Sequence, residues 1–205
     1  MKVRAGEWNY ESSAEDYQHV DIDVSRVILH PQYTRSSLRN NIVLLILQKP
    51  VELAPNINTV CLPSASDITD ETNCLSSGWG KDAFGKEGRY QVVMKKVKVP
   101  IVNNLQCQNE LRKTPQLGPQ FVLDSSSICA GGNGQDTCEG DGGSPLVCKK
   151  LDGSNKYVQL GVVAWGIGCN EPGRPAVYSS VVSAMPWITS EVTGMFGNDA
   201  TKYFF

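Results

Sequence analysis

The sequence predicts an all-β domain of the barrel or sandwich class. Most apolar runs are short and many alternate with polar residues, as in strands; clusters of turn-forming residues separate them; and only two stretches have a helical pattern. The 205 residues, 40% hydrophobic and 20% charged, suffice for one domain or two small barrels. No internal repeat is present.

Apolar periodicity places the expected strands. Residues 18–28 alternate between apolar and polar side chains, which is typical of a half-buried strand. Residues 42–47 form a continuous aliphatic run, and we expect that strand to be buried on both faces. Residues 92–99 alternate in their second half, until Pro100 stops the strand. Two further β-rich runs cover residues 157–165 and 176–182.

The remaining segments predict helices, turns and one boundary. Helical patterns are confined to residues 103–112 and 183–192, and turn clusters occupy residues 81–88 and 130–134. The Pro-rich stretch at residues 50–63 is the best candidate for a boundary between two halves.

Charge and hydropathy exclude several function classes. A formal net charge of −2 argues against nucleic-acid or membrane-surface binding, which usually needs a basic excess. The longest aliphatic run, residues 42–47, is far shorter than the roughly 20 residues of a membrane span. The first residues lack the apolar core of a signal peptide.

The seven cysteines are dispersed along the chain, without a Cys-x-x-Cys pair and with only two histidines to accompany them. A metal site is therefore poorly supported, whereas disulfides in a secreted protein are favoured. A secreted pattern without a secretion signal, together with an odd number of cysteines, leads us to expect a fragment.

One segment decides the family. The run Cys138-Glu139-Gly140-Asp141-Gly142-Gly143-Ser144-Pro145-Leu146 resembles the nucleophile loop of the chymotrypsin-like (S1) serine proteases. Five other segments resemble motifs of that family and occur in the family's order: NNIVLL at 40–45, CLSSGWG at 74–80, ICAG at 128–131, VAWG at 163–166 and PAVY at 175–178. The resemblance implies a trypsin-like double β-barrel with a truncated N-terminal barrel and a C-terminal helix. Residues 1–60 would be the remainder of the first barrel, and residues 61–205 the second barrel and the helix.

The family's chemistry needs a serine nucleophile, a histidine base and an aspartate that orients the histidine. At the matching positions stand Gly142 and Asn41, and the T-A-A-H-C stretch of the base is absent from the chain. We expect His19 and His30 to be ordinary surface or half-buried residues. Ser144 lies two positions from the nucleophile and is a poor substitute. We therefore expect no catalysis, although the fold class alone would suggest an active endopeptidase.

The resemblance assigns roles to further positions. Gly140 and Gly142 occupy the oxyanion-hole positions, and Asp141 needs a partner other than the N-terminal amine that binds it in active members. The former specificity pocket comprises Asp136, Ala164, Trp165, Gly166 and Ala176. Asp136 matches the carboxylate at the pocket's base, and Ala176 replaces a glycine and should narrow the pocket.

The family pattern also implies the disulfides Cys74–Cys148, Cys107–Cys129 and Cys138–Cys169, with Cys61 unpaired. We expect no metal and no cofactor.

The combination Gly142-Gly143-Ser144, with residues 3–8, 55–63 and 78–86, is similar to the insect clip-domain serine protease homologues. These are secreted, non-catalytic relatives that act in melanisation, a branch of innate immunity, as cofactors of prophenoloxidase activation. The implied partners are prophenoloxidase and its activating protease, with no nucleic acid and no membrane involved.

Three functions therefore compete. The first is a non-catalytic cofactor that binds through exposed loops, for which the candidates are residues 81–89, 112–120, 149–156 and 170–174. The second is an active trypsin-like endopeptidase, against which Gly142 and Asn41 argue. The third is a module that recognises microbial surfaces, which nothing in the sequence separates from the first. The exposed charges of Arg4 and Lys81 are expected to serve solvation only.

Overall fold

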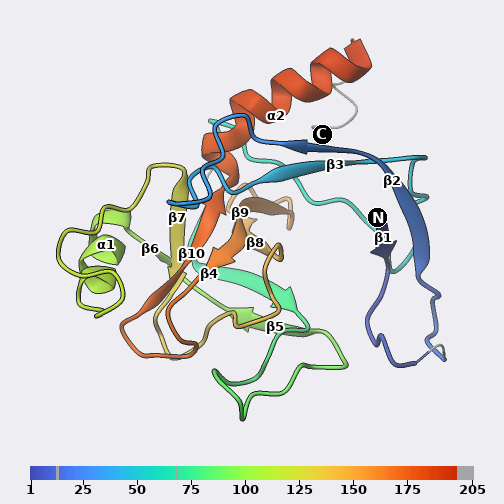
Figure 1. Ribbon diagram of the computed structural model, residues 1–205. Helices are drawn as coiled ribbons and strands as arrows, with labels where there is room; N and C mark the ends of the chain where they lie inside the picture. Colours follow the sequence, from blue (N-terminus) through green and yellow to red (C-terminus); the bar gives the residue numbers. More distant parts are fainter. Residues whose placement is uncertain (13, 68, 198–205) are drawn as a thin grey trace.

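The computed structural model describes residues 1–12, 14–67 and 69–197 and consists mainly of β-strands. Its elements are β1 (Lys2–Ala5), β2 (Val20–Leu29), β3 (Val43–Leu47), β4 (Thr69–Gly78), β5 (Lys95–Lys98), β6 (Ile101–Val102), α1 (Asn104–Arg112), β7 (Ser127–Gly131), β8 (Pro145–Lys150), β9 (Tyr157–Trp165), β10 (Pro175–Ser180) and α2 (Val181–Phe196). The predicted all-β class with a C-terminal helix is confirmed (Figure 1).

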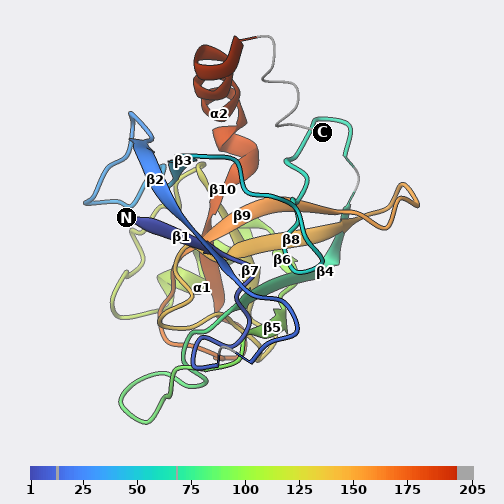
Figure 2. The ribbon, with the colours of Figure 1, turned by 90° about the vertical axis from the view of Figure 1, so that its right-hand side faces the viewer.

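The strands form two antiparallel sheets. The small sheet has the order β1-β2-β3, and the large sheet has the order β5-β4-β8-β9-β10-β7-β6. Within the small sheet, Val3 pairs with Ile22 and Leu29 pairs with Val43. Figures 1 and 2 show the small sheet beside the large one, with α2 rising next to both.

Three groups of buried side chains hold these elements together. The largest group lies within the large sheet, where Leu146, Val158 and Tyr178 are fully buried. A second group joins α1 to β7 and β10 through Leu111 and Val177. A third lies beneath α2, where Val181, Ala184 and Ile188 pack against side chains of the β2–β3 loop, β3 and β9.

All three disulfides lie in the part of the chain that forms the large sheet. They join Cys74 to Cys148, Cys107 to Cys129 and Cys138 to Cys169, with Cα–Cα distances of 4.2, 6.3 and 5.4 Å. These are the pairs that the family resemblance implies, and among the described residues Cys61 is the free cysteine. No disulfide within the described residues reaches the small sheet.

The aliphatic run at residues 42–47 forms β3, but the expectation that both of its faces are buried is wrong. Val43 is 42% exposed and Leu45 is 38% exposed, whereas Leu44 packs against the group beneath α2. The reason is that α2 covers only one face of the small sheet. The other face borders a cavity, which is described next.

Candidate functional site

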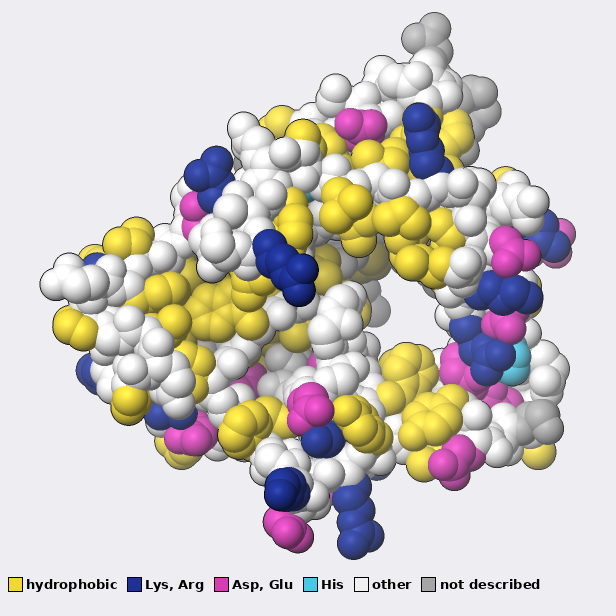
Figure 3. Space-filling model, viewed as in Figure 1, with side chains coloured by type: hydrophobic (Ala, Val, Ile, Leu, Met, Phe, Trp, Pro, Cys, Tyr) yellow, Lys and Arg dark blue, Asp and Glu magenta, His cyan; other side chains and the backbone are white. Residues whose placement is uncertain are grey.

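A cavity of about 720 Å³ lies between the small and large sheets, and its walls are mostly apolar. The small sheet contributes Val27, Leu29, Val43 and Leu45; the remaining lining residues are Tyr33, Asn41, Ile42, Gly142, Gly143, Gln159, Val162, Val163 and Ala164. Figure 3 shows hydrophobic side chains around the hollow between the two parts of the molecule. Gly142 and Asn41, the residues that the motif resemblance matches to the catalytic serine and aspartate, thus line the same cavity.

Gly142 leaves open space. A Cβ atom added at this position would meet no heavy atom within 4 Å outside its chain neighbours. Gly140 is different, because its φ is +99° and an added Cβ would lie 2.6 Å from the ring of Tyr90. A larger residue is therefore sterically possible at position 142 but not at position 140.

Among the described residues, no histidine lines this cavity. His19 contacts Glu7, at 3.2 Å, within the connection between β1 and β2. His30 is buried, its ring lies 4.8 Å from that of Trp187 on α2, and burial lowers its pKa, which favours the neutral imidazole. Ser144 is not among the residues that line this cavity, and its hydroxyl faces Gly78, where an added Cβ would lie 2.9 Å from it.

A second cavity, of about 360 Å³, contains most of the expected specificity-pocket residues. Ala164, Trp165, Gly166 and Ala176 all line it, together with Gly140 and Gly142. Sequence reasoning did not assign five other residues to its wall: Phe84, Thr137, Glu139, Val163 and Gly168. The disulfide between Cys138 and Cys169 completes the wall.

Asp136 departs from the expectation, because it is not among the residues that line this pocket. It lines a separate cavity of about 200 Å³, together with Asp141. One oxygen of its carboxyl group accepts a hydrogen bond from the Thr137 N–H at 2.8 Å, which turns the group toward the backbone. Burial is the main cause that raises the pKa of Asp136 to about 7; the negative charge of Asp141 acts in the same direction, and backbone N–H donors of Thr137 and Asn170 oppose it.

Stability should fall with rising pH because of Asp136. Between pH 4 and pH 7 this carboxyl group is ionised in the unfolded chain but stays protonated in the folded chain. Because the folded chain then binds more protons than the unfolded chain, the free energy of unfolding decreases as the pH rises through this range. Asp136→Asn should flatten that fall in a series of thermal midpoints measured from pH 4 to pH 8. Asp152→Asn is the matched control, because the pKa of this exposed carboxyl is lowered to about 2, so the group is ionised throughout this pH range and its removal should leave the slope unchanged. An unchanged pH profile in Asp136→Asn would contradict the assignment.

The carboxylate of Asp141 is hydrogen-bonded to backbone groups of the chain. Its carboxylate oxygens accept hydrogen bonds from the backbone N–H groups of Gly80, at 2.8 Å, and Cys138, at 2.9 Å. These bonds tie the loop that carries Gly142 to the loop after β4. Asp141 therefore holds the pocket's wall without an ammonium group.

The loop at residues 81–90 lies against the pocket through one polar cluster. The Lys81 ammonium donates to Glu139 at 2.6 Å, and the Tyr90 hydroxyl donates to the other oxygen of the same carboxylate at 3.2 Å. The hydrogen bond with Glu139 raises the pKa of Lys81, and the same bond lowers the pKa of Glu139. Lys81 is thus paired rather than merely solvated, although exposed pairs add little stability. Arg4 is also paired, with Asp21 at 2.7 Å.

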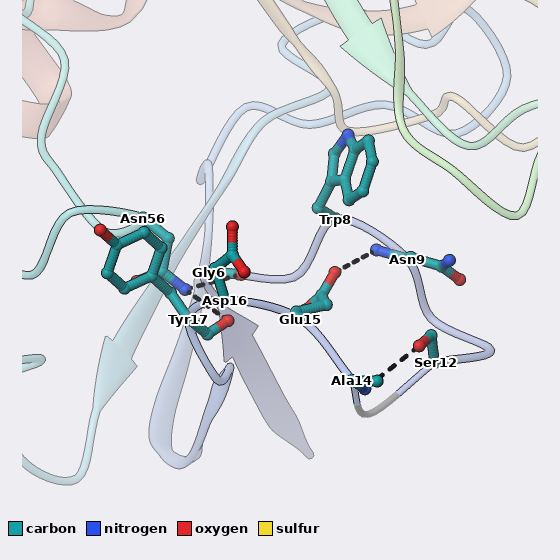
Figure 4. Close-up of a pocket in the computed structure, with 9 residues that line it drawn as sticks. All are labelled: Gly6, Trp8, Asn9, Ser12, Ala14, Glu15, Asp16, Tyr17 and Asn56. Atoms are coloured by element: carbon teal, nitrogen blue, oxygen red, sulfur yellow. Dashed lines mark hydrogen bonds between the residues drawn. The ribbon is translucent and has the colours of Figure 1, made fainter.

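A further cavity, of about 340 Å³, lies within the loop that connects β1 and β2 (Figure 4). Asn56 donates hydrogen bonds to the carbonyl oxygens of Gly6, at 3.0 Å, and Tyr17, at 3.3 Å. The Asn9 N–H donates to Glu15 at 2.7 Å. The polar groups of this loop therefore bind one another and hold the loop against the segment after β3.

Two other kinds of feature are absent from the part of the chain that the structure describes. No helix there has the length and apolar character needed to cross a membrane. No group of three or more His, Cys, Asp or Glu side chains there is arranged to hold a metal ion.

Comparison with known proteins places this arrangement in a family. The family described as Trypsin matches residues 1–188. The chain is 49% identical to phenoloxidase-activating factor 2 of Galleria mellonella, over 99% of this chain and 67% of that protein. It is 46% identical to inactive CLIP domain-containing serine protease A3 of Aedes aegypti, over 94% of this chain and 40% of that protein.

The corresponding protein A28 of Anopheles gambiae is 39% identical, over 98% of this chain and 52% of its own length. The chain thus spans only 40% and 52% of the two mosquito relatives. Since the family match covers most of the chain and agrees with the two-sheet architecture, the chain belongs to the trypsin family of serine protease domains.

Proposed function

We propose that this chain is a non-catalytic member of the trypsin family that acts by binding proteins, as a secreted cofactor of prophenoloxidase activation. The observation that carries the proposal is the cavity shared by Gly142 and Asn41, because neither residue supplies a nucleophile or a negative charge. Relatives named as inactive proteases and as a phenoloxidase-activating factor support it. The three disulfides support an extracellular location.

The expected loss of catalysis is large. Removing the nucleophile costs on the order of 10⁶ in turnover, and replacing the orienting aspartate by asparagine costs about 10⁴ on its own. The two losses are not additive, but either one leaves essentially no protease activity.

Gly142→Ser should not restore proteolysis. The side chain fits, since the space around Gly142 is open, but among the described residues no imidazole lines the cavity to accept the hydroxyl proton. Gly142→Ala is the matched control, because it adds the same Cβ without the hydroxyl. Cleavage of an arginyl reporter peptide should be equal for both variants. Faster cleavage by the serine variant would show that a base is present.

We assign the binding surface to the rim of the 360 Å³ pocket. Phe84 is 65% exposed and Tyr90 is 53% exposed, although both side chains are large and apolar. Exposed aromatic side chains beside a concave pocket are typical of the residues that dominate protein–protein binding energy. The Lys81–Glu139–Tyr90 cluster holds this loop in place before a partner binds.

A cofactor without catalysis can act by holding two proteins together. If prophenoloxidase and its activating protease bind one surface, the effective concentration of each near the other rises, and cleavage accelerates. The chain should therefore accelerate activation only when the active protease is also present.

Reconstitution from purified components tests this. Phenoloxidase activity is followed with prophenoloxidase alone, with the chain, with the activating protease, and with both. We expect the highest rate with both and no activity with the chain alone. Equal rates with and without the chain, and no complex with the zymogen, would refute the cofactor role. A pull-down with microbial glycans in place of the zymogen tests surface recognition separately.

Two single-residue variants test whether the rim of the 360 Å³ pocket is the binding surface. Phe84→Ala should reduce the acceleration, because it removes an exposed aromatic side chain from the pocket rim. Val122→Ala is the control: this side chain is 71% exposed but does not line the pocket. Equal acceleration by the two variants would place the binding surface elsewhere.

A further inference from the structure

The loop between β2 and β3 has a weakly held tip at residues 34–39. Its ends are joined by a hydrogen bond from the Thr34 N–H to the Arg39 carbonyl, at 3.1 Å. Residues 34–37 are exposed, and within the described chain residues 35–37 form no hydrogen bond. Leu38 has a φ of +53°, an unfavourable conformation for a side chain of this kind. Exposed tips of this type open locally at little cost and are preferred sites of proteolysis.

The stem of the same loop is firmly anchored. The Asn40 N–H donates to the Ser126 hydroxyl at 2.9 Å, and the Ser179 hydroxyl donates to the Asn41 carbonyl at 2.6 Å. Both contacts fix residues 40 and 41 to the large sheet. The tip can therefore extend into a protease's active site while the β2–β3 pairing stays intact.

The disulfides decide what a cut does to the chain. They link residue 74 to 148, 107 to 129 and 138 to 169, so any cut between residues 74 and 169 leaves the two pieces covalently joined. This holds for Lys86 and Arg89 in the exposed loop at residues 81–90. Only a cut outside these limits separates the chain into two pieces.

Outside residues 74–169, few basic residues are followed by a peptide bond that a trypsin-like protease can cut. Lys49 and Arg174 each precede a proline, which such proteases do not accept. Lys2 and Arg4 lie in β1, and Arg26 lies in β2, where the backbone is engaged in sheet pairing.

Two arginines remain at the loop tip. Arg39 is held, because its carbonyl accepts the Thr34 hydrogen bond and its side chain lies 3.9 Å from Asp124. Arg35 has neither constraint, and the residue after it, Ser36, is small and exposed. Among the described residues, Arg35 is thus the basic residue that is both accessible and able to separate the chain.

We propose that the Arg35–Ser36 bond is a processing site for a protease of trypsin-like specificity. Water adds across the amide: the C–N bond breaks, Arg35 keeps the carboxylate and Ser36 gains an amine. Residues 1–35 then contact residues 36–205 only through non-covalent interactions, including the pairing of β2 with β3. Val27 and Leu29 line the 720 Å³ cavity from the smaller piece, so after the cut non-covalent contacts alone hold this part of the wall in place. This inference does not depend on the proposed cofactor role.

Limited digestion of the folded chain by trypsin tests the site. Samples are separated on denaturing gels with and without reductant, and the new N-terminus is sequenced. We expect the first product to begin at Ser36 and to separate from residues 1–35 without reductant. Arg35→Gln should abolish this product and Arg35→Lys should retain it. Arg89→Gln, in the other exposed loop, should leave it unchanged.

Two results would overturn the proposal. The first is an initial cut at Lys86 or Arg89, recognised because its pieces separate only after reduction. The second is an unchanged first product in Arg35→Gln. Equal thermal midpoints of the intact variants and the wild type verify that altered digestion does not come from unfolding.

Discussion

Replacing Cys74 and Cys148 together with alanine is expected to lower the free energy of unfolding by about 4 kcal/mol. The bond closes a loop with a sequence separation of 74 residues, and constraining the unfolded chain over that length has a stabilising effect of this order. Both sulfur atoms are also fully buried within the group of side chains that forms the core of the large sheet. Urea unfolding under oxidising conditions measures the effect.

Cys61→Ala provides the control for this prediction. Its thiol is free and only partly buried, so the substitution should cost less than about 1 kcal/mol. A double variant that unfolds at the same urea concentration as Cys61→Ala would show that the disulfide contributes nothing.

The second large effect is expected for Asp141→Ala, at about 2–6 kcal/mol. The substitution leaves the N–H groups of Gly80 and Cys138 without their acceptor in a partly buried place, and each unsatisfied donor costs about 1–3 kcal/mol. Asp141→Asn keeps one acceptor oxygen and should lose less. The free energy of unfolding in urea measures both variants.

Asp152→Ala is the matched control, because its carboxylate is exposed and its contacts are the Ser154 N–H and the Lys150 ammonium at the end of β8. A loss for Asp141→Ala no larger than that of this control would mean that the loop around Gly142 is held by other contacts.

The sequence predicts best those elements whose apolar pattern is local. The range predicted for residues 157–165 matches β9, and α1 begins one residue after the predicted start because Asn103 caps it. β4 escaped prediction because Thr69–Gly78 is mostly polar, and three of its residues in a row are exposed. The strand is recognisable only from its pairing with β5 and β8.

The candidate site, too, could be predicted from the sequence only in part. The motif resemblance led to positions that the structure brings together, since Asn41 shares one cavity with Gly142 and Ala176 shares the other. The directions and contacts of individual side chains could not be predicted in the same way. The direction of the Asp136 carboxyl depends on a backbone hydrogen bond, and the contact between Lys81 and Glu139 joins residues 58 positions apart. Neither leaves a pattern in the linear sequence.

The uneven placement of the disulfides has a consequence for how the molecule opens. All three bonds lie between residues 74 and 169, and the small sheet consists of three strands with one face on a cavity. Opening free energies within one protein range from near zero to the global value, and regions with few buried contacts open first. In hydrogen–deuterium exchange, amides of β2 and β3 should therefore exchange through partial opening events, before those of β8, β9 and β10. A partner that fills the cavity would slow exchange in the small sheet, and in the disulfide-linked sheet its direct effect would be confined to β9, which lines the same cavity.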